Sequence, residues 1–369
     1  MASTGKHKIL FIGPLPPPVH GQALHFMDTY RGVKNCGKYL VSINATGKSF
    51  PLIIMLVMVS VIKVLWVLFF KKVDTVYFTG SRSRKGGLFD LFVIGFSRIF
   101  GARVINHLHG AEFREYYLNL PFCWKKIATV FYRMTDTLIV LTEGMRDDLK
   151  PFFPETKIEV VKNFYAKDFE RELTKKPSSA GHIVYVSNIM MSKGIFDLLD
   201  AFENVAPDFD FLRLSIAGDF VGDHLMSKSQ VKTFFEKKIN DLKERLPGRI
   251  HYLSVVGGEE KVTLFMNSDI FVLPSYHRSE ALPLSIIEAM RTGNAIITTR
   301  HNYLPEIISE KNGFLVEPKS SVEIEGALTA LLRDTNRKKQ IQAYNITQAK
   351  ALYSYDRYIE NISRIFGIS

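Results

Sequence analysis

The sequence predicts an α/β protein built from two Rossmann-like domains, each with a parallel sheet. Its 369 residues exceed the length of one ordinary α/β core and suit two domains. Short β-branched runs alternate with helical stretches, which is the pattern of a parallel sheet with crossover helices. A polar stretch at residues 173–182 interrupts this alternation, which then starts again. We therefore expect an N-terminal domain at 1–172, a linker at 173–182, and a C-terminal domain at 183–350.

Each domain is expected to contain six strands, with helices between them. The strands expected in the first domain are Lys8–Ile12, Tyr39–Asn44, Val73–Thr79, Arg103–His107, Thr137–Leu141 and Ile158–Lys162. Those expected in the second domain are Ile183–Ser187, Leu212–Ala217, Ile250–Leu253, Ile270–Leu273, Ala295–Thr299 and Gly313–Val316. The tail from Ser321 onward has a helical pattern.

The positive charge of the chain is concentrated in its first half. The whole chain has 48 Lys and Arg against 37 Asp and Glu, which gives a formal net charge of +11. Residues 1–150 hold 20 of the basic and 9 of the acidic residues, so residues 151–369 hold 28 of each. A basic half attracts an anionic membrane, nucleic acid or a phosphorylated acceptor, or it is simply a solvated surface.

Cysteine usage and the start of the chain indicate a reducing compartment. Cys36 and Cys123 are the two cysteines, and thiols so far apart form neither a metal motif nor a disulfide spacing. The first ten residues lack the apolar run of a secretory signal. We therefore expect a cytoplasmic protein.

One stretch is apolar enough to nearly span a bilayer. Residues 52–70 are apolar except for Ser60 and Lys63, and a helix rises about 1.5 Å per residue. A crossing here would put the strands before and after it on opposite sides of the membrane, so one sheet could not form. We therefore expect a helix of the first domain whose outer face contacts lipid or a partner. Burial of the whole helix within the domain is the alternative.

The strongest group of candidate site residues follows the strand Ile270–Leu273. Residues 274–290 read PSYHRSEALPLSIIEAM. Pro283 fits the first turn of a helix, where its missing N–H costs nothing, and Leu282 then supplies no capping oxygen. The first-turn N–H groups are left for another acceptor, and such a helix start suits a diphosphate.

Two glutamates in this segment are candidates for sugar binding. Glu280 precedes the helix and can face the same cleft as the helix start. Glu288 lies among apolar residues, where a glutamate is almost never fully buried without a partner. Its carboxylate either accepts hydrogen bonds from two vicinal ribose hydroxyls or lies on the solvated face of the helix. Both interpretations are open.

Three loops carry further candidates. Lys193 lies in the loop VSNIMMSKG at 186–194, between a strand and a helix, and an ordinary surface lysine is the alternative interpretation. Gly21 and Gln22 end the proline-rich loop after the first strand, where a glycine can bring backbone close to a ligand. This loop is not a GxGxxG fingerprint, which disfavours a dinucleotide oxidoreductase. His109 lies at the carboxyl end of a strand, where ligands of such sheets bind, or is a structural loop histidine.

These motifs, in this order, resemble those of glycosyltransferase family 4. Glu280 and Glu288 are separated by seven residues, with Pro-Ser before them and Ala-Met after them. The resemblance continues through GNAIITT at 293–299, LPEII at 304–308 and NGFLV at 312–316. It implies the GT-B fold, in which two Rossmann-like domains with parallel sheets face each other across a cleft. It also implies that the final helix, residues 351–369, returns to the first domain.

The resemblance implies roles for individual residues. Glu280 matches the glutamate beside the sugar ring, His109 the histidine near the donor sugar, and Lys193 the lysine that holds the diphosphate. Glu288 matches the glutamate that binds the donor ribose. The remaining donor-binding positions are Gly21, Gln22, Asn188, Val255, Val256, Ala281, Leu282, Pro283 and Leu284. Asn188 departs from the pattern, because many relatives have arginine there, so one fixed cation is missing. Ala-Leu-Pro after Glu280 also replaces the usual Gly-Phe-Gly, which bears on the sugar accepted.

The activity implied by the resemblance is retaining transfer of a hexose-type sugar from a UDP- or GDP-sugar to a lipid-linked glycan. The process would be cell-surface polysaccharide biosynthesis of the O-antigen kind, in the cytoplasm at the inner face of the membrane. Neither a metal nor a cofactor is implied, because the nucleotide-sugar is a co-substrate, and nucleic acid is not an expected partner. Two alternatives stay open: a GT-B-type sugar epimerase or phosphorylase, and a non-catalytic membrane scaffold.

Two groups of aromatic and basic residues in the first domain suit a lipid surface. One group consists of Tyr116, Tyr117, Phe122, Trp124, Lys125 and Lys126, and the other of Arg82, Arg84, Lys85 and Phe89. Such a mixture suits an anionic membrane surface or a lipid-diphosphate acceptor. Scattered surface charge is the alternative interpretation.

Overall fold

The computed structural model divides into two compact units, which are described separately. It describes residues 6–16, 21–42, 49–152, 158–173 and 181–368. The first unit comprises residues 1–163 and 356–369, and the second comprises residues 164–355. All but a few residues of the expected linker therefore lie outside the described part of the chain.

The first unit is built on a parallel six-stranded sheet in the order β2-β1-β3-β4-β5-β6. Its strands are β1 (Lys8–Gly13), β2 (Gly37–Ser42), β3 (Thr75–Thr79), β4 (Arg103–His107), β5 (Thr137–Val140) and β6 (Ile158–Val160). All six expected strands are present, with ends that differ by a few residues. The expected strand end at Asn44 lies outside the described residues.

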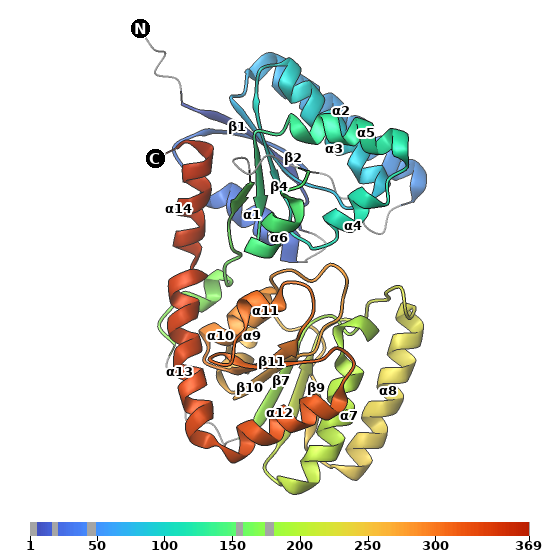
Figure 1. Cartoon of the computed structure of the whole chain (residues 1–369), viewed down its shortest axis with the longest axis vertical. Coiled ribbons are helices and arrows are strands. Elements are labelled where there is room, and N and C mark those ends of the chain that lie inside the picture. Colours follow the sequence, from blue (N-terminus) through green and yellow to red (C-terminus); the bar gives the residue numbers. More distant parts are fainter. Residues whose placement is uncertain (1–5, 17–20, 43–48, 153–157, 174–180, 369) are drawn as a thin grey trace. The chain divides into compact units, whose positions relative to one another are not determined.

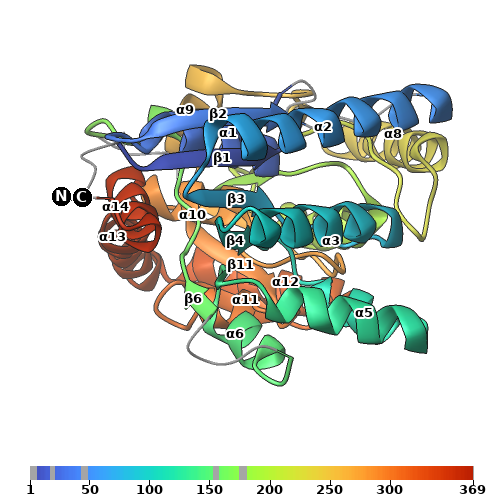
Figure 2. The ribbon, with the colours of Figure 1, turned by 90° about the horizontal axis from the view of Figure 1, so that it is seen from above.

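Helices cover both faces of this sheet. They are α1 (Gly21–Gly32), α2 (Phe50–Lys71), α3 (Arg84–Ile99), α4 (Phe113–Leu118), α5 (Phe122–Arg133), α6 (Glu143–Leu149) and α14 (Tyr355–Phe366). On one face α1 and α14 pack together, with Thr29 Oγ1 and the Tyr358 hydroxyl 2.6 Å apart. On the other face α2, α3 and α5 lie side by side (Figures 1 and 2). The connection from β1 to β2 through α1 and the connection from β2 to β3 through α2 run in opposite directions along the sheet. Because such connections are right-handed, they place α1 and α2 on opposite faces.

Helix α2 does not cross a membrane in this fold. It is long and apolar enough to do so, with a mean hydropathy of 2.8 over Pro51–Lys71. However, the strands before and after it, β2 and β3, both pair with β1 in one sheet, so its two ends stay on the same side. Only 22% of its most apolar window is buried, so the interpretation of a helix buried within the domain is wrong.

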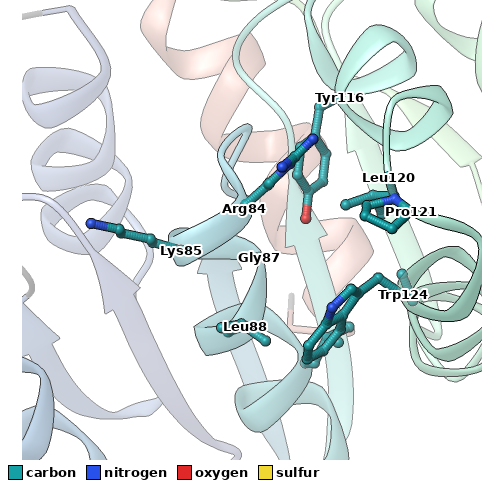
Figure 3. Close-up of a pocket in the computed structure, with 10 residues that line it drawn as sticks. Arg84, Lys85, Gly87, Leu88, Tyr116, Leu120, Pro121 and Trp124 are labelled. Atoms are coloured by element: carbon teal, nitrogen blue, oxygen red, sulfur yellow. The ribbon is translucent and has the colours of Figure 1, made fainter.

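A pocket of about 220 Å³ opens between α3, α4 and α5 of the first unit (Figure 3). Its wall is largely apolar and includes Leu88, Leu91, Pro121 and Trp124. The two groups of aromatic and basic residues singled out in the sequence meet here. The first contributes Tyr116 and Trp124, and the second contributes Arg84 and Lys85.

The second unit contains another parallel six-stranded sheet, in the order β12-β11-β10-β7-β8-β9. Its strands are β7 (His182–Val186), β8 (Arg213–Ala217), β9 (Ile250–Tyr252), β10 (Ile270–Leu273), β11 (Ala295–Thr299) and β12 (Gly313–Val316). All six match expected strands. β10 is fully buried because helices cover both faces of the sheet.

The helices of the second unit connect these strands. They are η2 (Lys167–Phe169), η3 (Met191–Lys193), α7 (Ile195–Val205), η4 (Ala206–Asp208), α8 (Lys228–Arg245), α9 (Gly258–Met266), α10 (Leu284–Arg291), α11 (Leu304–Ile307), α12 (Ser321–Arg333) and α13 (Thr335–Leu352). The chain runs outward from β7 through β9 and then returns to place β10 on the other side of β7. The point where the strand order reverses is therefore between β7 and β10. Ligands of open α/β sheets bind outside the carboxyl ends of the strands at such a point.

Candidate active site

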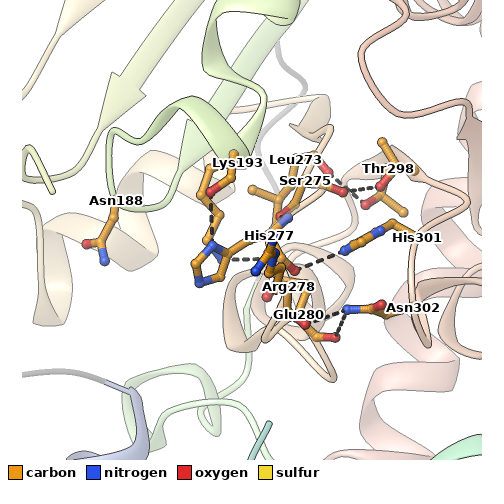
Figure 4. Close-up of polar contacts among 12 residues, drawn as sticks. Asn188, Lys193, Leu273, Ser275, His277, Arg278, Glu280, Thr298, His301 and Asn302 are labelled. Atoms are coloured by element: carbon orange, nitrogen blue, oxygen red, sulfur yellow. Dashed lines mark hydrogen bonds and ion pairs between the residues drawn. The ribbon is translucent and has the colours of Figure 1, made fainter. Parts of the chain in front are cut away.

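A buried ion pair lies where the strand order of the second unit reverses. Lys193, in η3 after β7, places its Nζ 2.5 Å from Oε2 of Glu280, in the loop after β10 (Figure 4). The Ser275 hydroxyl donates a hydrogen bond to the same carboxylate oxygen over 2.6 Å. The structure therefore brings together two of the three residues expected to be catalytic.

The backbone around Lys193 depends on the glycine that follows it. Gly194 has a φ of +72°, in the left-handed region that favours glycine. A Cβ at this position would also lie 2.1 Å from the carbonyl oxygen of Pro274. Glycine therefore lets the Lys193 loop approach the start of the Glu280 loop closely enough for the ion pair to form.

Further hydrogen bonds fix the Glu280 loop. The Ser192 hydroxyl and the His277 Nδ1 atom are 2.9 Å apart, which joins the Lys193 loop to the Glu280 loop. Asn302, which has a φ of +46°, donates from Nδ2 to the carbonyl oxygens of Arg278 and Glu280 over 2.9 and 3.1 Å. Asparagine is one of the few non-glycine residues found in this backbone region. The loop is therefore held from both sides (Figure 4).

The electrostatics favour an ionised pair. Burial raises the pKa of Glu280, but the Lys193 ammonium and the hydrogen bond from Ser275 outweigh burial and lower it overall. Burial and the nearby Lys193 charge lower the pKa of His277, so this imidazole is neutral at pH 7. The pKa of Asp223 is lowered to about 2. Burial opposes this shift, but hydrogen bonds to the carboxylate, two of them from Ser192, outweigh burial. The site thus combines fixed charges with a neutral imidazole.

The helix that follows Glu280 begins one residue later than expected. Pro283 is the N-cap of α10, and not its first residue, because its ψ of 128° is extended rather than helical. It provides no side-chain hydrogen bond to the helix start. The expected absence of a side-chain cap is therefore confirmed, although the residue responsible is Pro283 and not Leu282. Ala281 and Leu282 are buried, and Leu284 opens the helix.

Glu288 lies inside the second unit and not on its solvated face. Its exposed fraction is 1%, so that interpretation is wrong. Nζ of Lys261, on α9, lies 2.5 Å from Oε2 of Glu288. The Lys261 ammonium occupies one of the lone-pair sites of this carboxylate, of which a carboxylate has about four. The carboxylate therefore keeps the capacity to accept hydrogen bonds from a ligand.

Three other donor-binding candidates of the second unit lie apart from these ion pairs. Asn188 is exposed on the loop that leads to Lys193, and no contact joins its side chain to the pair in Figure 4. Val255 and Val256 lie between β9 and α9, with Val255 exposed and Val256 buried.

Gly21, Gln22 and His109 belong to the first unit. Gly21 and Gln22 are the first residues of α1, and most of the proline-rich loop before them, residues 17–20, lies outside the described residues. His109 follows β4 at the carboxyl edge of the sheet. The units are described separately, so the relation of His109 to Glu280 stays a prediction.

His109 is half-buried and packs against two buried imidazoles. Its ring centroid lies 3.9 Å from that of His107 and 5.4 Å from that of His25. Burial, with the Arg82 charge as a second cause, lowers the pKa of His109 to about 3. The Tyr77 hydroxyl lies 2.7 Å from Nδ1 of His107. His109 is thus a neutral imidazole at pH 7, able to exchange hydrogen bonds but not to supply positive charge.

Sequence analysis did not identify several residues of the site. Lys261 follows two glutamates in an exposed-looking helix, so nothing in its surroundings indicated a buried partner. The burial of Glu288 implies a cation nearby but does not say which lysine provides it. His277 and Asn302 act through contacts between loops that are far apart in the sequence. No group of three His, Cys, Asp or Glu side chains that could hold a metal ion occurs within the described ranges.

Comparison with known structures defines the class of fold. The chain is similar to Anabaena Alr3699/HepE, whose structure is known in complex with UDP, with a TM-score of 0.74. That match covers 98% of this chain and 99% of the other at 16% identity. The match to a glycosyltransferase from Rickettsia africae has a TM-score of 0.75 and 18% identity, and covers 98% of both chains. The fold is GT-B, as expected.

The sequence comparisons identify the domain family. Residues 166–348 match the family described as glycosyl transferases group 1, so the second unit is a domain of that family. An α-1,3-N-acetylgalactosaminyltransferase from Campylobacter jejuni, named for an undecaprenyl diphosphate-linked substrate, is 32% identical over 126 residues. A lipopolysaccharide 1,2-N-acetylglucosaminetransferase from Salmonella typhimurium is 25% identical over 239 residues. The matches cover 31% and 62% of this chain, and 32% and 60% of the two relatives.

Proposed function

We propose that this protein is a glycosyltransferase of bacterial cell-surface polysaccharide biosynthesis. It transfers a hexose-type sugar from a UDP- or GDP-sugar to a lipid-linked glycan. The observation that carries the proposal is the Lys193–Glu280 ion pair beside the start of α10, at the reversal point of a group 1 domain. An ammonium group and a helix start without a side-chain cap suit a diphosphate.

Each residue of the site has a role in this proposal. The Lys193 ammonium and the start of α10 bind the donor diphosphate and stabilise the charge it gains when the glycosidic bond breaks. Glu288, whose carboxylate has lone pairs beyond the contact with Lys261, accepts hydrogen bonds from the ribose hydroxyls. Glu280 binds hydroxyls of the transferred sugar, and the neutral His109 is a hydrogen-bond partner for that sugar from the first unit.

The proposed reaction retains the configuration of the anomeric carbon. A double displacement through the protein needs a carboxylate nucleophile beside that carbon. In this proposal Glu280 binds hydroxyls of the sugar and Glu288 binds those of the ribose, so neither is assigned as that nucleophile. The acceptor hydroxyl therefore attacks from the face that the diphosphate leaves, and the departing phosphate oxygen takes its proton. Lys193 and α10 supply the counter-charge, so the proposal needs neither a metal nor a cofactor.

The proposed acceptor is lipid-linked and is reached from the cytoplasmic face of the inner membrane. The Campylobacter jejuni relative is named for a diphospho-undecaprenol substrate, and the Salmonella relative for lipopolysaccharide. The exposed apolar helix α2 and the basic first half of the chain support a membrane location. Nucleic acid has no place in this proposal.

Ligand binding tests the donor site directly. Thermal unfolding is measured with UDP, GDP and their sugars, because a ligand at about 100 times its Kd stabilises the native state by about 2.7 kcal/mol. We expect one of the two nucleotide series to raise Tm, and Lys193→Met to abolish the rise. Product analysis in reactions without an acceptor distinguishes an epimerase from a transferase, because an epimerase acts on the sugar nucleotide alone. Failure of every nucleotide diphosphate to raise Tm would exclude the proposal and favour a non-catalytic scaffold.

A further inference from the structure

The outer side of α2, α3 and α5 exposes an unusual amount of apolar surface. We call it the three-helix face. Its most exposed large side chains include Ile62, Phe69 and Phe70 of α2, Leu88 of α3, and Phe122 and Val130 of α5, each at least half exposed. The three helices lie side by side on one face of the first sheet (Figure 2). Contiguous apolar surface of this kind marks a site of association.

The charged side chains of the three helices are almost all basic, although Arg98 is paired with Asp136 just after α5. The three helices carry the basic residues Lys63, Lys71, Arg84, Lys85, Arg98, Lys125, Lys126 and Arg133. Their one acidic residue, Asp90, is buried. Two ammonium groups lie over aromatic rings, with Lys71 Nζ 4.9 Å from the centroid of Trp66 and Lys126 Nζ 4.4 Å from that of Phe122. Mixed aromatic and basic side chains are typical of the membrane interface.

The charge decides between two occupants of this face. A second copy of the chain, related by a two-fold axis, would bring the same positive side chains together, and the repulsion would oppose pairing. An anionic bilayer offers hydrocarbon to the apolar side chains and negative headgroups to the cations. Spanning the bilayer is excluded for α2 by the pairing of β2 and β3 with β1. The helix therefore lies along the interface.

The pocket between α3 and α5 opens within this face. Leu88, Leu91 and Trp124 provide an apolar wall, and Arg84 lines it from the first turn of α3, while the Lys85 side chain points away from Tyr116 and Trp124 (Figure 3). The hydroxyl of Tyr116 packs against the backbone of α3, because a Cβ at Gly87 would lie 1.9 Å from it. An apolar wall with a guanidinium group beside it suits a hydrocarbon chain that ends in a phosphate.

We propose that the three-helix face docks on an anionic lipid bilayer and that the pocket receives a phosphate-headed hydrocarbon chain from it. The chain belongs either to a membrane phospholipid or to a prenyl phosphate, which share this chemistry. The docking stands independently of the proposed transferase. The assignment of a prenyl phosphate rests on the proposed transferase function, because such a lipid carries the acceptor glycan.

The two tryptophans of the chain make this proposal directly measurable. Trp66 and Trp124 are the only ones, and both lie on the three-helix face, at 50% and 46% exposure. The full-length protein is mixed with vesicles of phosphatidylcholine and phosphatidylglycerol whose acyl chains are brominated. We expect a blue shift and strong quenching of both tryptophans, resolved with Trp66→Phe and Trp124→Phe. Emission that the vesicles leave unchanged would overturn the docking.

Matched variants test the apolar and the electrostatic contributions. Ile62→Glu on α2 is expected to reduce vesicle binding at least tenfold, whereas Val322→Glu on α12, at a similar exposure, leaves it unchanged. Replacing Arg84 and Lys85 by Gln should weaken binding to phosphatidylglycerol vesicles by about 30-fold, since each basic residue contributes about 1 kcal/mol. Replacing Lys237 and Lys243 of α8 by Gln removes the same charge elsewhere and should have little effect. Equal losses of vesicle binding in the two members of either matched pair would refute the assignment of the three-helix face as the docking surface.

The source of the chain is resolved with the Trp66→Phe variant, which reports from Trp124 alone. Phosphatidylcholine vesicles are loaded with either phosphatidylglycerol or a long-chain polyprenyl monophosphate at equal charge. A larger response to the prenyl phosphate assigns the pocket to that lipid, and an equal response, which docking alone produces, would overturn the pocket assignment. No response of Trp124 to either lipid would overturn the pocket assignment. Vesicle binding without any nucleotide-induced rise in Tm would exclude the proposed transferase function and leave the docking proposal standing.

Discussion

Replacing Lys193 by methionine separates the structural role of the ion pair from its proposed chemical role. Methionine keeps most of the volume of the lysine stem but removes the ammonium group. Glu280, only 7% exposed, then keeps the Ser275 hydroxyl as a partner but loses its counter-charge. Breaking a buried pair in this way costs about 3–5 kcal/mol. We therefore expect Lys193→Met to lower the free energy of unfolding by about that amount at pH 7.

The double variant Lys193→Met with Glu280→Gln is the matched control. A neutral glutamine still accepts the hydrogen bond from Ser275 and leaves no uncompensated charge, so we expect a loss of only about 1 kcal/mol. The Glu280→Gln single variant completes the cycle, and the coupling is the loss in the double variant minus the losses in the two single variants. Sugar transfer should stay lost in Lys193→Met and in the double variant, because neither has the ammonium group that binds the diphosphate.

The pH dependence of Lys193→Met gives an independent check. Lys193 lowers the pKa of Glu280 in the native protein, and burial alone acts in the opposite direction. Without the lysine the folded-state pKa lies above its unfolded value, so the folded state holds the proton more tightly and stability falls as pH rises. Stability is measured by urea unfolding followed by far-UV circular dichroism from pH 4.5 to 8. A double variant as unstable as Lys193→Met, or one that transfers sugar, would refute this reasoning.

Three further predictions concern single buried or constrained positions. Burial raises the pKa of Asp90 to about 8, so the protein should lose stability as pH rises from 5 to 8. A scan of Tm against pH should show this loss in the wild type and not in Asp90→Asn. Gly194→Ala combines a φ of +72° with a Cβ 2.1 Å from the Pro274 oxygen, and should lower the unfolding free energy by more than about 1 kcal/mol and weaken diphosphate binding, measured by urea unfolding and calorimetry. Glu288→Gln leaves Lys261 without its carboxylate and should weaken nucleoside diphosphate binding more than binding of inorganic pyrophosphate, measured by calorimetry; equal losses would place Glu288 away from the ribose.

Most of the fold could be predicted because its signals are local. Each strand is a short β-branched run bounded by a change of pattern, so all twelve strands were expected. The order of those strands in the sheets was not available from the sequence, because it depends on contacts between distant segments. Without it, the reversal point between β7 and β10 could not be located. Only the family resemblance suggested that Lys193 and Glu280 belong to one site.

The parts of the site that could not be predicted depend on contacts between elements. The pairing of Lys261 with Glu288 joins α9 to α10, and both lysine and glutamate are common on solvated helices. His25 was not a candidate, although the fold places it beside His107 and His109. Pro283 shows the limit of a local rule, because a proline is tolerated both at the N-cap and in the first turn. The dihedral angles, and not the residue type, decide between the two positions.

The arrangement of the two ion pairs suggests how donor binding proceeds in the proposed function. Lys193 is held by Glu280 in the free protein, with both side chains largely buried, so the cation is oriented before a diphosphate binds. A diphosphate that contacts the lysine competes with the carboxylate for it. Glu280 then has oxygen atoms available for hydroxyl groups of the sugar, so one exchange of partners prepares both subsites. Because the same lysine serves both anions, Glu280→Gln should strengthen binding of nucleoside diphosphate alone while weakening that of the sugar nucleotide relative to it.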